Sequence, residues 1–234
     1  MIRRIWMAGI VMAMVGLAWP ARAASNRSDD IERIDNSAQV FQDIMKTPDK
    51  AVPQELLETA RCIAIIPNEK KAAFGVGGRY GKGLATCRTA NGWSAPLFIT
   101  VGGGSIGWQI GGSSTDIVML FMNDAALQRL LSDKFRIGGE ASAAAGPVGR
   151  HAAASTDIKL HAEILTYSRS RGVFAGVSLD GAVIQPDESG NQALYGDPVN
   201  REKVLNGSVA VPTPAKALVS EISRYAKSAR NGQQ

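Results

Sequence analysis

Apolar side chains recur every three or four positions near both ends of the chain, which is the spacing of an amphipathic helix. In residues 28–46 this stripe consists of Ile31, Ile34, Ala38, Phe41 and Met45. Ser28 can cap the helix, and Pro48 follows its end. A similar stripe begins near Pro214. The sequence therefore predicts helical flanks at 28–46 and 214–229.

Between these flanks the pattern changes to short runs rich in β-branched residues and separated by glycine. Most of the 25 glycines lie within 75–181, and helices tolerate glycine poorly. Asn91-Gly92 is a strong signal for a β-hairpin turn. The run over 62–67 predicts a compact strand that Pro67 closes.

Two short helical patterns interrupt this central region, one after Pro53 and one after Asn123. No linker or internal repeat divides the chain. The pattern predicts a single α+β domain with a strongly curved, mainly antiparallel, barrel-like sheet and flanking helices at both ends.

Residues 1–23 have the pattern of a cleaved secretory signal. A basic start is followed by an apolar run over 5–19 that is too short to span a bilayer comfortably. Ala21 and Ala23 then occupy the small positions of a cleavage site, and no lipobox cysteine follows the run. We expect cleavage near Ala23, a mature domain over 24–234, and a periplasmic or secreted bacterial location.

The predicted cleavage changes the charge of the protein. It removes Arg3, Arg4 and Arg22, which leaves 23 basic against 21 acidic residues and lowers the net charge from +5 to +2. A balance this close to neutral argues against nucleic acid as a partner. Any binding of anions must then come from local basic patches.

The two cysteines, Cys62 and Cys87, lie in strand-like segments. In an oxidising compartment such a pair is typical of a disulfide. The alternative, a redox or metal pair, lacks the usual C-x-x-C spacing.

The glycine-rich stretch 99–112 fits two catalytic patterns. It contains G-x-G-x-x-G, which is found in dinucleotide-binding loops, and G-x-S-x-G around Ser105, which is found at the nucleophile of serine hydrolases. Both patterns need a helix directly after the motif, and Gly111 and Gly112 would break it. We interpret the glycines as backbone devices of a curved sheet, with a serine hydrolase using Ser105 as the weaker alternative.

A metal or cofactor site has little support in the sequence. His151, His161 and the two cysteines are suitable zinc ligands in type, but their spacing is not that of a zinc site. No acidic cluster indicates calcium, and Lys82 is followed by glycine where a nucleotide P-loop has serine or threonine. We predict no cofactor, no metal and no enzymatic activity.

Several ordered motifs resemble the SYLF lipid-binding domain family, also known as the Ysc-type actin-binding domain. The matching segments are "VPQELLETARCIAIIP", "KAAFGVGGRYGKGLATCR", "GWSAPLFITVGGGSIGWQIGGSSTDIVMLFMN", "KFRIGGEASAAAGPVGR", "EILTYSRSRGVFAGVSLDGAVI" and "LYG", and together they cover about residues 50–197. The resemblance implies binding rather than catalysis. It points to phosphoinositide-like or other anionic phospholipid, contacted peripherally and reversibly. Actin, a partner of some eukaryotic members, has no place in a periplasm.

Clustered basic residues beside glycine provide a physical basis for binding phosphate head groups. The candidates are Lys70, Lys71, Arg79, Lys82, Lys134, Arg136, Arg150, Arg169 and Arg171. We hypothesise that 79–82 and 169–171 form two glycine-rich turns that meet at one rim of the sheet.

Two questions stay open at this level. Trp93 and Trp108 could rest at a membrane interface, line an acyl groove or pack in the core. A structural or partner-binding envelope protein without lipid affinity is the alternative function, and the oligomeric state is unknown.

Overall fold

The computed structural model describes residues 27–47, 52–74, 76–106, 111–148, 162–170, 173–196 and 198–227. The predicted signal (1–23), both histidines, Trp108, Arg150 and Arg171 lie outside these residues. The described helices are α1 (Arg27–Lys46), α2 (Gln54–Thr59), α3 (Asp124–Leu131), α5 (Glu188–Tyr195), α6 (Arg201–Leu205), the 3-10 helix η2 (Thr213–Ala215) and α7 (Lys216–Lys227). None of the helices in the described ranges is long and apolar enough to cross a bilayer.

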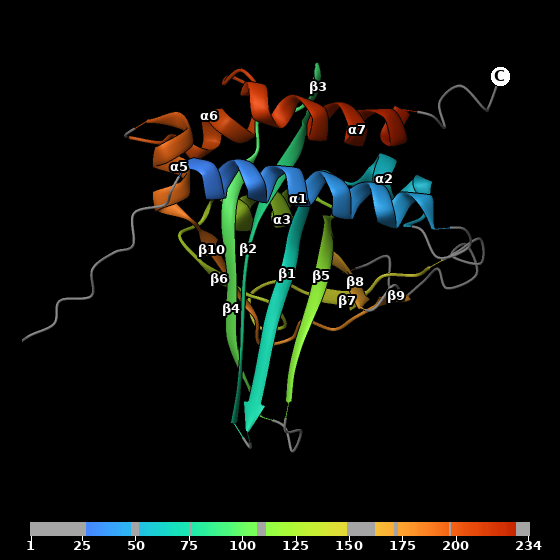
Figure 1. Ribbon diagram of the computed structural model, residues 1–234. Helices are drawn as coiled ribbons and strands as arrows, with labels where there is room; N and C mark the ends of the chain where they lie inside the picture. Colours follow the sequence, from blue (N-terminus) through green and yellow to red (C-terminus); the bar gives the residue numbers. More distant parts are fainter. Residues whose placement is uncertain are drawn as a thin grey trace, which may run out of the picture.

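The two predicted helical flanks are confirmed as α1 and α7, which lie side by side across one face of the sheet (Figure 1). The buried face of α1 is rotated from the predicted stripe, since Ile31 and Ala38 are only half-buried. Its buried residues are Asp30, Arg33, Ile34, Ser37, Val40, Phe41 and Ile44. α1 packs on β1 and β2, as expected of a helix that covers a sheet rather than a membrane.

The ten strands form one sheet with the order β6-β10-β4-β2-β1-β5-β8-β7, while β3 pairs with β2 and β9 with β8. Their bounds are β1 Cys62–Phe74, β2 Val76–Thr89, β3 Gly92–Trp93, β4 Leu97–Ile106, β5 Gly111–Phe121, β6 Phe135–Arg136, β7 Ala143–Ala145, β8 Ile164–Ser170, β9 Val173–Gly176 and β10 Val183–Pro186. The pairs are antiparallel except for β7 with β8. The predicted α+β, mainly antiparallel fold is confirmed.

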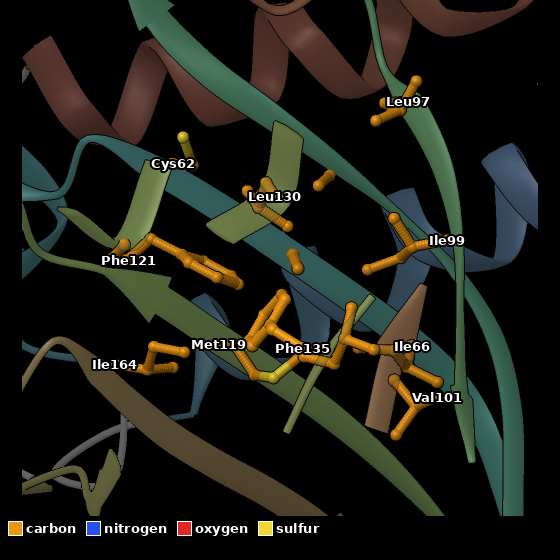
Figure 2. Close-up of a cluster of buried hydrophobic side chains, with 14 of the residues drawn as sticks. Cys62, Ile66, Leu97, Ile99, Val101, Met119, Phe121, Leu130, Phe135 and Ile164 are labelled. Carbon is orange, nitrogen blue, oxygen red and sulfur yellow. The ribbon is translucent and has the colours of Figure 1, made fainter. Parts of the chain in front are cut away.

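The sheet is strongly curled, as a contact between distant strands shows. Phe121 of β5 and Phe135 of β6 are five strand positions apart, which in a flat sheet would separate them by about 24 Å. Their ring centroids are 6.3 Å apart. A half-barrel therefore encloses one hydrophobic core on its concave side, where side chains of β1, β4, β5 and β8 converge with Phe135 and Leu130 (Figure 2). A second core lies between the other face and α1, α2 and α7.

The predicted disulfide is confirmed: Cys62 and Cys87 are bonded and face each other in the register of β1 and β2. The hairpin at Asn91-Gly92 is also confirmed, because β2 and β3 pair around it. Trp93 belongs to the core under the helices, where the guanidinium of Arg88 lies 4.7 Å from its ring centroid.

One strand prediction is wrong. β1 does not end at Pro67 but continues to Phe74. The proline is accommodated because the register shifts around residues 66–69 and Asn68 adopts a φ of +52°. Such a bulge leaves a residue without a ladder partner, so a missing N–H is tolerated there.

Candidate functional site

Four strands continue beyond the helical layer as a long projection (Figure 1). We call residues 69–74, 76–81, 102–106 and 111–115 of β1, β2, β4 and β5 the glycine-rich extension. Among the described residues, β10 pairs with β4 only as far as Gly102, and β8 pairs with β5 only from Asp116 onward. The extension therefore leaves the body of the sheet as a four-stranded ribbon in the order β4-β2-β1-β5.

The register of the extension places its basic residues in two adjacent rows. The rows, read across the four strands, are Gly102–Tyr80–Lys70–Ser114 and Gly103–Arg79–Lys71–Ser113. Successive residues of a strand point to opposite faces. One row therefore faces the helix side of the sheet and the other faces the concave side.

The helix-side row carries an aromatic and a basic side chain next to each other. Lys70 is exposed and makes no ion pair with a described residue. Tyr80, its register partner on β2, is 53% exposed, and among the described residues no other large hydrophobic side chain is exposed. The next row consists of Gly104, Gly78, Ala72 and Gly112. Because this row carries no side chain larger than a methyl group, it does not cover the Lys70–Tyr80 pair.

The concave row is different because a carboxylate lies against its cations. Arg79 Nε is 3.4 Å from Glu69 Oε1, and Lys71 Nζ is 3.7 Å from Glu69 Oε2. The Glu69 side chain is fully buried, whereas Lys71 keeps 33% of its side chain exposed. Burial raises the pKa of Glu69, and the charges of Arg79 and Lys71 oppose this rise.

Lys82, also on β2, is engaged in an internal charge network. Its ammonium is 3.3 Å from Asp187 Oδ2, and Arg33 Nη1 of α1 donates to the same oxygen at 2.9 Å. Burial alone would raise the pKa of Asp187, but a hydrogen bond from Ser189 and the charges of Arg33 and Lys82 hold it below its ordinary value. Lys82 therefore joins β2 to α1 and α5.

Arg169 on β8 is held between two carboxylates. It reaches Asp43 of α1 at 2.7 Å and Asp116 of β5 at 3.0 Å. Burial alone would lower the pKa of Arg169, but its hydrogen bonds to these carboxylates raise it. Residues 79–82 lie within β2 rather than in a turn, and β1 and β5 separate β2 from β8. The predicted meeting of these two segments at one rim is wrong.

Of the other described candidates, Lys134 and Arg136 are exposed at β6, the strand at one end of the sheet order. Arg136 lies in register with Gly102 but is separated from it by Val183 of β10. The structure thus brings together Lys70, Lys71 and Arg79. Sequence reasoning missed Tyr80 and Glu69 at this site; the position of Tyr80 between Arg79 and Lys82 in a strand pattern was the available signal.

Other chemistry finds little support in the described residues. Ser105 precedes the end of β4, and the next element is a strand, whereas a nucleophile elbow leads into a helix. Groups of three or more His, Cys, Asp or Glu side chains able to hold a metal are absent from the described ranges. A cavity beside α5 is lined by Asp133, Asp187 and Glu188 among others, and its described lining contains no basic side chain that would bind an anion.

Comparison with known proteins now places the chain in a family. The model of the Ysc84 family, described as Las17-binding protein actin regulator, matches residues 102–225, which is more than half of the chain. The chain belongs to the Ysc84 family. The matched range begins within the glycine-rich extension and continues through most of α7.

Similar relatives occur among fungal and animal proteins. The chain is 36% identical over 173 residues to SH3 domain-containing protein PJ696.02 of Schizosaccharomyces pombe, covering 72% of this chain and 40% of that protein. It is 35% identical over 175 residues to Protein YSC84 of Saccharomyces cerevisiae (73% and 37%). It is 32% identical over 181 residues to the Xenopus laevis SH3 domain-containing YSC84-like protein 1 (76% and 54%). This Ysc84-family chain thus matches about half or less of the length of these curated relatives.

Proposed function

We propose that this Ysc84-family protein is a non-catalytic, peripheral membrane-binding protein that engages the phosphates of anionic phospholipids through its glycine-rich extension. The observation that carries the proposal is the exposed Lys70–Tyr80 pair, with Lys71 and Arg79 in the adjacent row. A lysine beside an exposed aromatic suits the boundary between head groups and acyl chains, where a cation meets phosphate and a tyrosine ring is half in apolar surroundings.

The sequence at the end of the extension supports a bilayer rather than a soluble anion as the partner. The last row of the register consists of Ile106, Val76 and Phe74. These positions lie four residues beyond the Lys70–Tyr80 row, or about 13 Å at about 3.3 Å per residue. Head groups are roughly 5–8 Å deep on each side of a bilayer, so a separation of about 13 Å lets the end of the extension reach the acyl chains while the basic row stays at the phosphates.

The predicted export of the protein would place this site beside envelope phospholipid. Attraction to an anionic surface contributes roughly 1 kcal/mol per basic residue near it. The few cations of the extension would thus give reversible binding that weakens as salt screens the charges.

Co-sedimentation with vesicles tests the proposal. The purified protein should pellet with mixed phosphatidylglycerol and phosphatidylcholine vesicles, and much less with pure phosphatidylcholine. The double variant K70Q/K71Q should bind about 30-fold more weakly, as expected for two lost cations at about 1 kcal/mol each. The matched control K203Q/K216Q removes two exposed cations from α6 and α7, away from the extension, and should bind as the wild type does. Equal losses in both variants would contradict the proposed site.

A second candidate function is binding to a protein partner, which the family description favours by naming Las17 binding and actin regulation. Those words describe the family and its characterised relatives. The same sedimentation assay with actin filaments in place of vesicles examines this candidate. Pelleting with filaments but not with anionic vesicles would replace the lipid proposal with this one.

A further inference from the structure

The bulge in β1 turns Glu69 into the interior of the protein. Before the bulge, Cys62, Ala64 and Ile66 point into the concave core, so strict alternation would give the concave side to residues 68 and 70. The register shift around 66–69 adds one residue, and Glu69 moves to the concave face. Bulges re-aim side chains in this way and are frequent beside functional sites.

Two glycines of β2 leave room for this bulge. A Cβ at Gly81 would lie 2.6 Å from Ile66 Cγ2, and one at Gly83 would lie 2.2 Å from the carbonyl oxygen of Ile65. Glycine on β2 is therefore needed where β1 bends toward it. The placement of Glu69 depends on residues of both strands and is a built feature of the extension.

Glu69 is an unusual buried carboxylate. Its side chain is 0% exposed, yet neither carboxylate oxygen accepts a hydrogen bond from a described residue. Arg79 Nη1 is likewise buried without an acceptor among those residues. A buried charge without hydrogen bonds costs stability. Because the cluster of Glu69, Lys71 and Arg79 costs stability, a role in binding explains it better than a role in folding.

Only two charged groups face this carboxylate within the described residues. They are Lys71 from β1 and Arg79 from β2. The register partner on β5 is Thr115, which does not titrate. Asp180 is the acidic residue of the neighbouring loop whose Gly181 and Ala182 lie against Gly103. Its carboxylate accepts a hydrogen bond from Ser178 and lies against Gly138.

A further charge pair lies nearby on the opposite face of the sheet, where Asp116 binds Arg169.

Because burial raises the pKa of Glu69 above its ordinary value, this carboxyl takes up a proton at a higher pH than exposed carboxylates do.

We propose that Glu69 is a proton-controlled internal counter-ion of the lipid site: ionised, it neutralises one cation of the extension, and protonated, it releases that cation for phospholipid phosphate. This inference rests on the proposed function of the same site. Lys70, Lys71, Arg79 and Glu69 together carry a charge of +2 when Glu69 is ionised and +3 when it is protonated. One additional cation near an anionic surface strengthens binding about fivefold.

The test is the pH dependence of vesicle binding by the full chain. Affinity for phosphatidylglycerol-containing vesicles is measured between pH 7.5 and pH 5.5, a range in which ordinary carboxylates stay ionised. Wild type should bind more tightly at the acidic end, with a gain that approaches fivefold as Glu69 becomes fully protonated. E69Q should bind at pH 7.5 at least as tightly as wild type does at pH 5.5, and its profile should be flat.

Two controls separate Glu69 from other causes. D124N also removes one negative charge, from the exposed pair with Arg61, and should keep the wild-type profile. The variant H151Q/H161Q removes both histidines, which titrate in the same range, and should also keep it. If E69Q does not fold, the salt dependence of wild-type binding takes its place. A cation released by protonation of Glu69 should make vesicle affinity fall more steeply with salt at pH 5.5 than at pH 7.5, and equal salt dependence at the two pH values would refute the role of Glu69.

The outcomes distinguish this inference from the function on which it rests. If wild type binds no anionic vesicles at any pH, the proposed function fails. If wild type binds with a flat pH profile, or if E69Q keeps the wild-type slope, the membrane site stands and the role of Glu69 is refuted. A slope that H151Q/H161Q abolishes would also refute it.

Discussion

The two ends of β1 and β2 differ in burial: one end packs in the core and the other presents side chains to solvent. At the helix-covered end these strands carry the Cys62–Cys87 disulfide and fully buried residues such as Ile63 and Leu84. At the other end the same strands carry Lys70 and Tyr80 in the open. A strand whose register is fixed by packing at one end can present side chains for surface contact at the other. Stability and binding are thus separable, and variants at the two ends should affect different measurements.

The largest loss of stability is expected in the concave core. Phe121 is fully buried, and its contact with Phe135 connects distant strands of the curled sheet. F121A should lower the free energy of unfolding by about 4 kcal/mol, because it removes a large side chain and leaves a cavity. Urea unfolding measures this. A cost below about 1 kcal/mol would show that the curl does not depend on this contact.

Removing the disulfide should have the next largest effect. The double variant C62A/C87A is expected to lose about 3 kcal/mol, since the bond restricts the unfolded chain. Vesicle binding at a temperature where the variant remains folded should be unchanged. A selective loss of binding with little loss of stability would mean that the two ends are not independent.

A smaller effect is expected where α1 and α5 are joined. D187N should cost about 2 kcal/mol at neutral pH, a magnitude typical of hydrogen bonds to charged groups. Because the folded pKa of Asp187 is below the ordinary value of 3.8, its contribution is present above about pH 4 and is lost as the pH falls through the folded pKa. Urea unfolding between pH 7 and pH 3 should therefore show a flatter acid limb for D187N. An acid limb as steep as that of wild type would contradict this assignment.

The smallest effect on stability is expected at Tyr80. Y80S should change the free energy of unfolding by less than about 0.5 kcal/mol, as is usual for exposed positions. Its affinity for anionic vesicles should fall about fivefold, equivalent to roughly 1 kcal/mol of partial burial of the ring. An unstable Y80S protein, or one that binds vesicles normally, would place Tyr80 outside the site.

Local patterns predicted those features that depend on neighbours in sequence. The helices α1 and α7, the Asn91-Gly92 hairpin and the mainly antiparallel sheet all follow from periodicity and turn residues. The bulge after Pro67 was missed because a proline within a strand pattern normally ends the strand.

The candidate site was harder to predict because its charges pair across long sequence distances. Arg169 meets Asp43 of α1, and Lys82 meets Asp187, which lies beyond β10. Basic residues beside glycine therefore looked equivalent in sequence, although among the candidates that the structure describes only Lys70, Lys71 and Arg79 share the extension. No local pattern shows which cation has an internal counter-ion.

Hydrogen–deuterium exchange with and without phosphatidylglycerol-containing vesicles locates the surface that meets the membrane. Vesicles should slow amide exchange at 69–81 and 102–115, while exchange in α1 and α7 stays unchanged. Protection confined to α1 or α7, with the extension exchanging as in the free protein, would contradict the proposed lipid site.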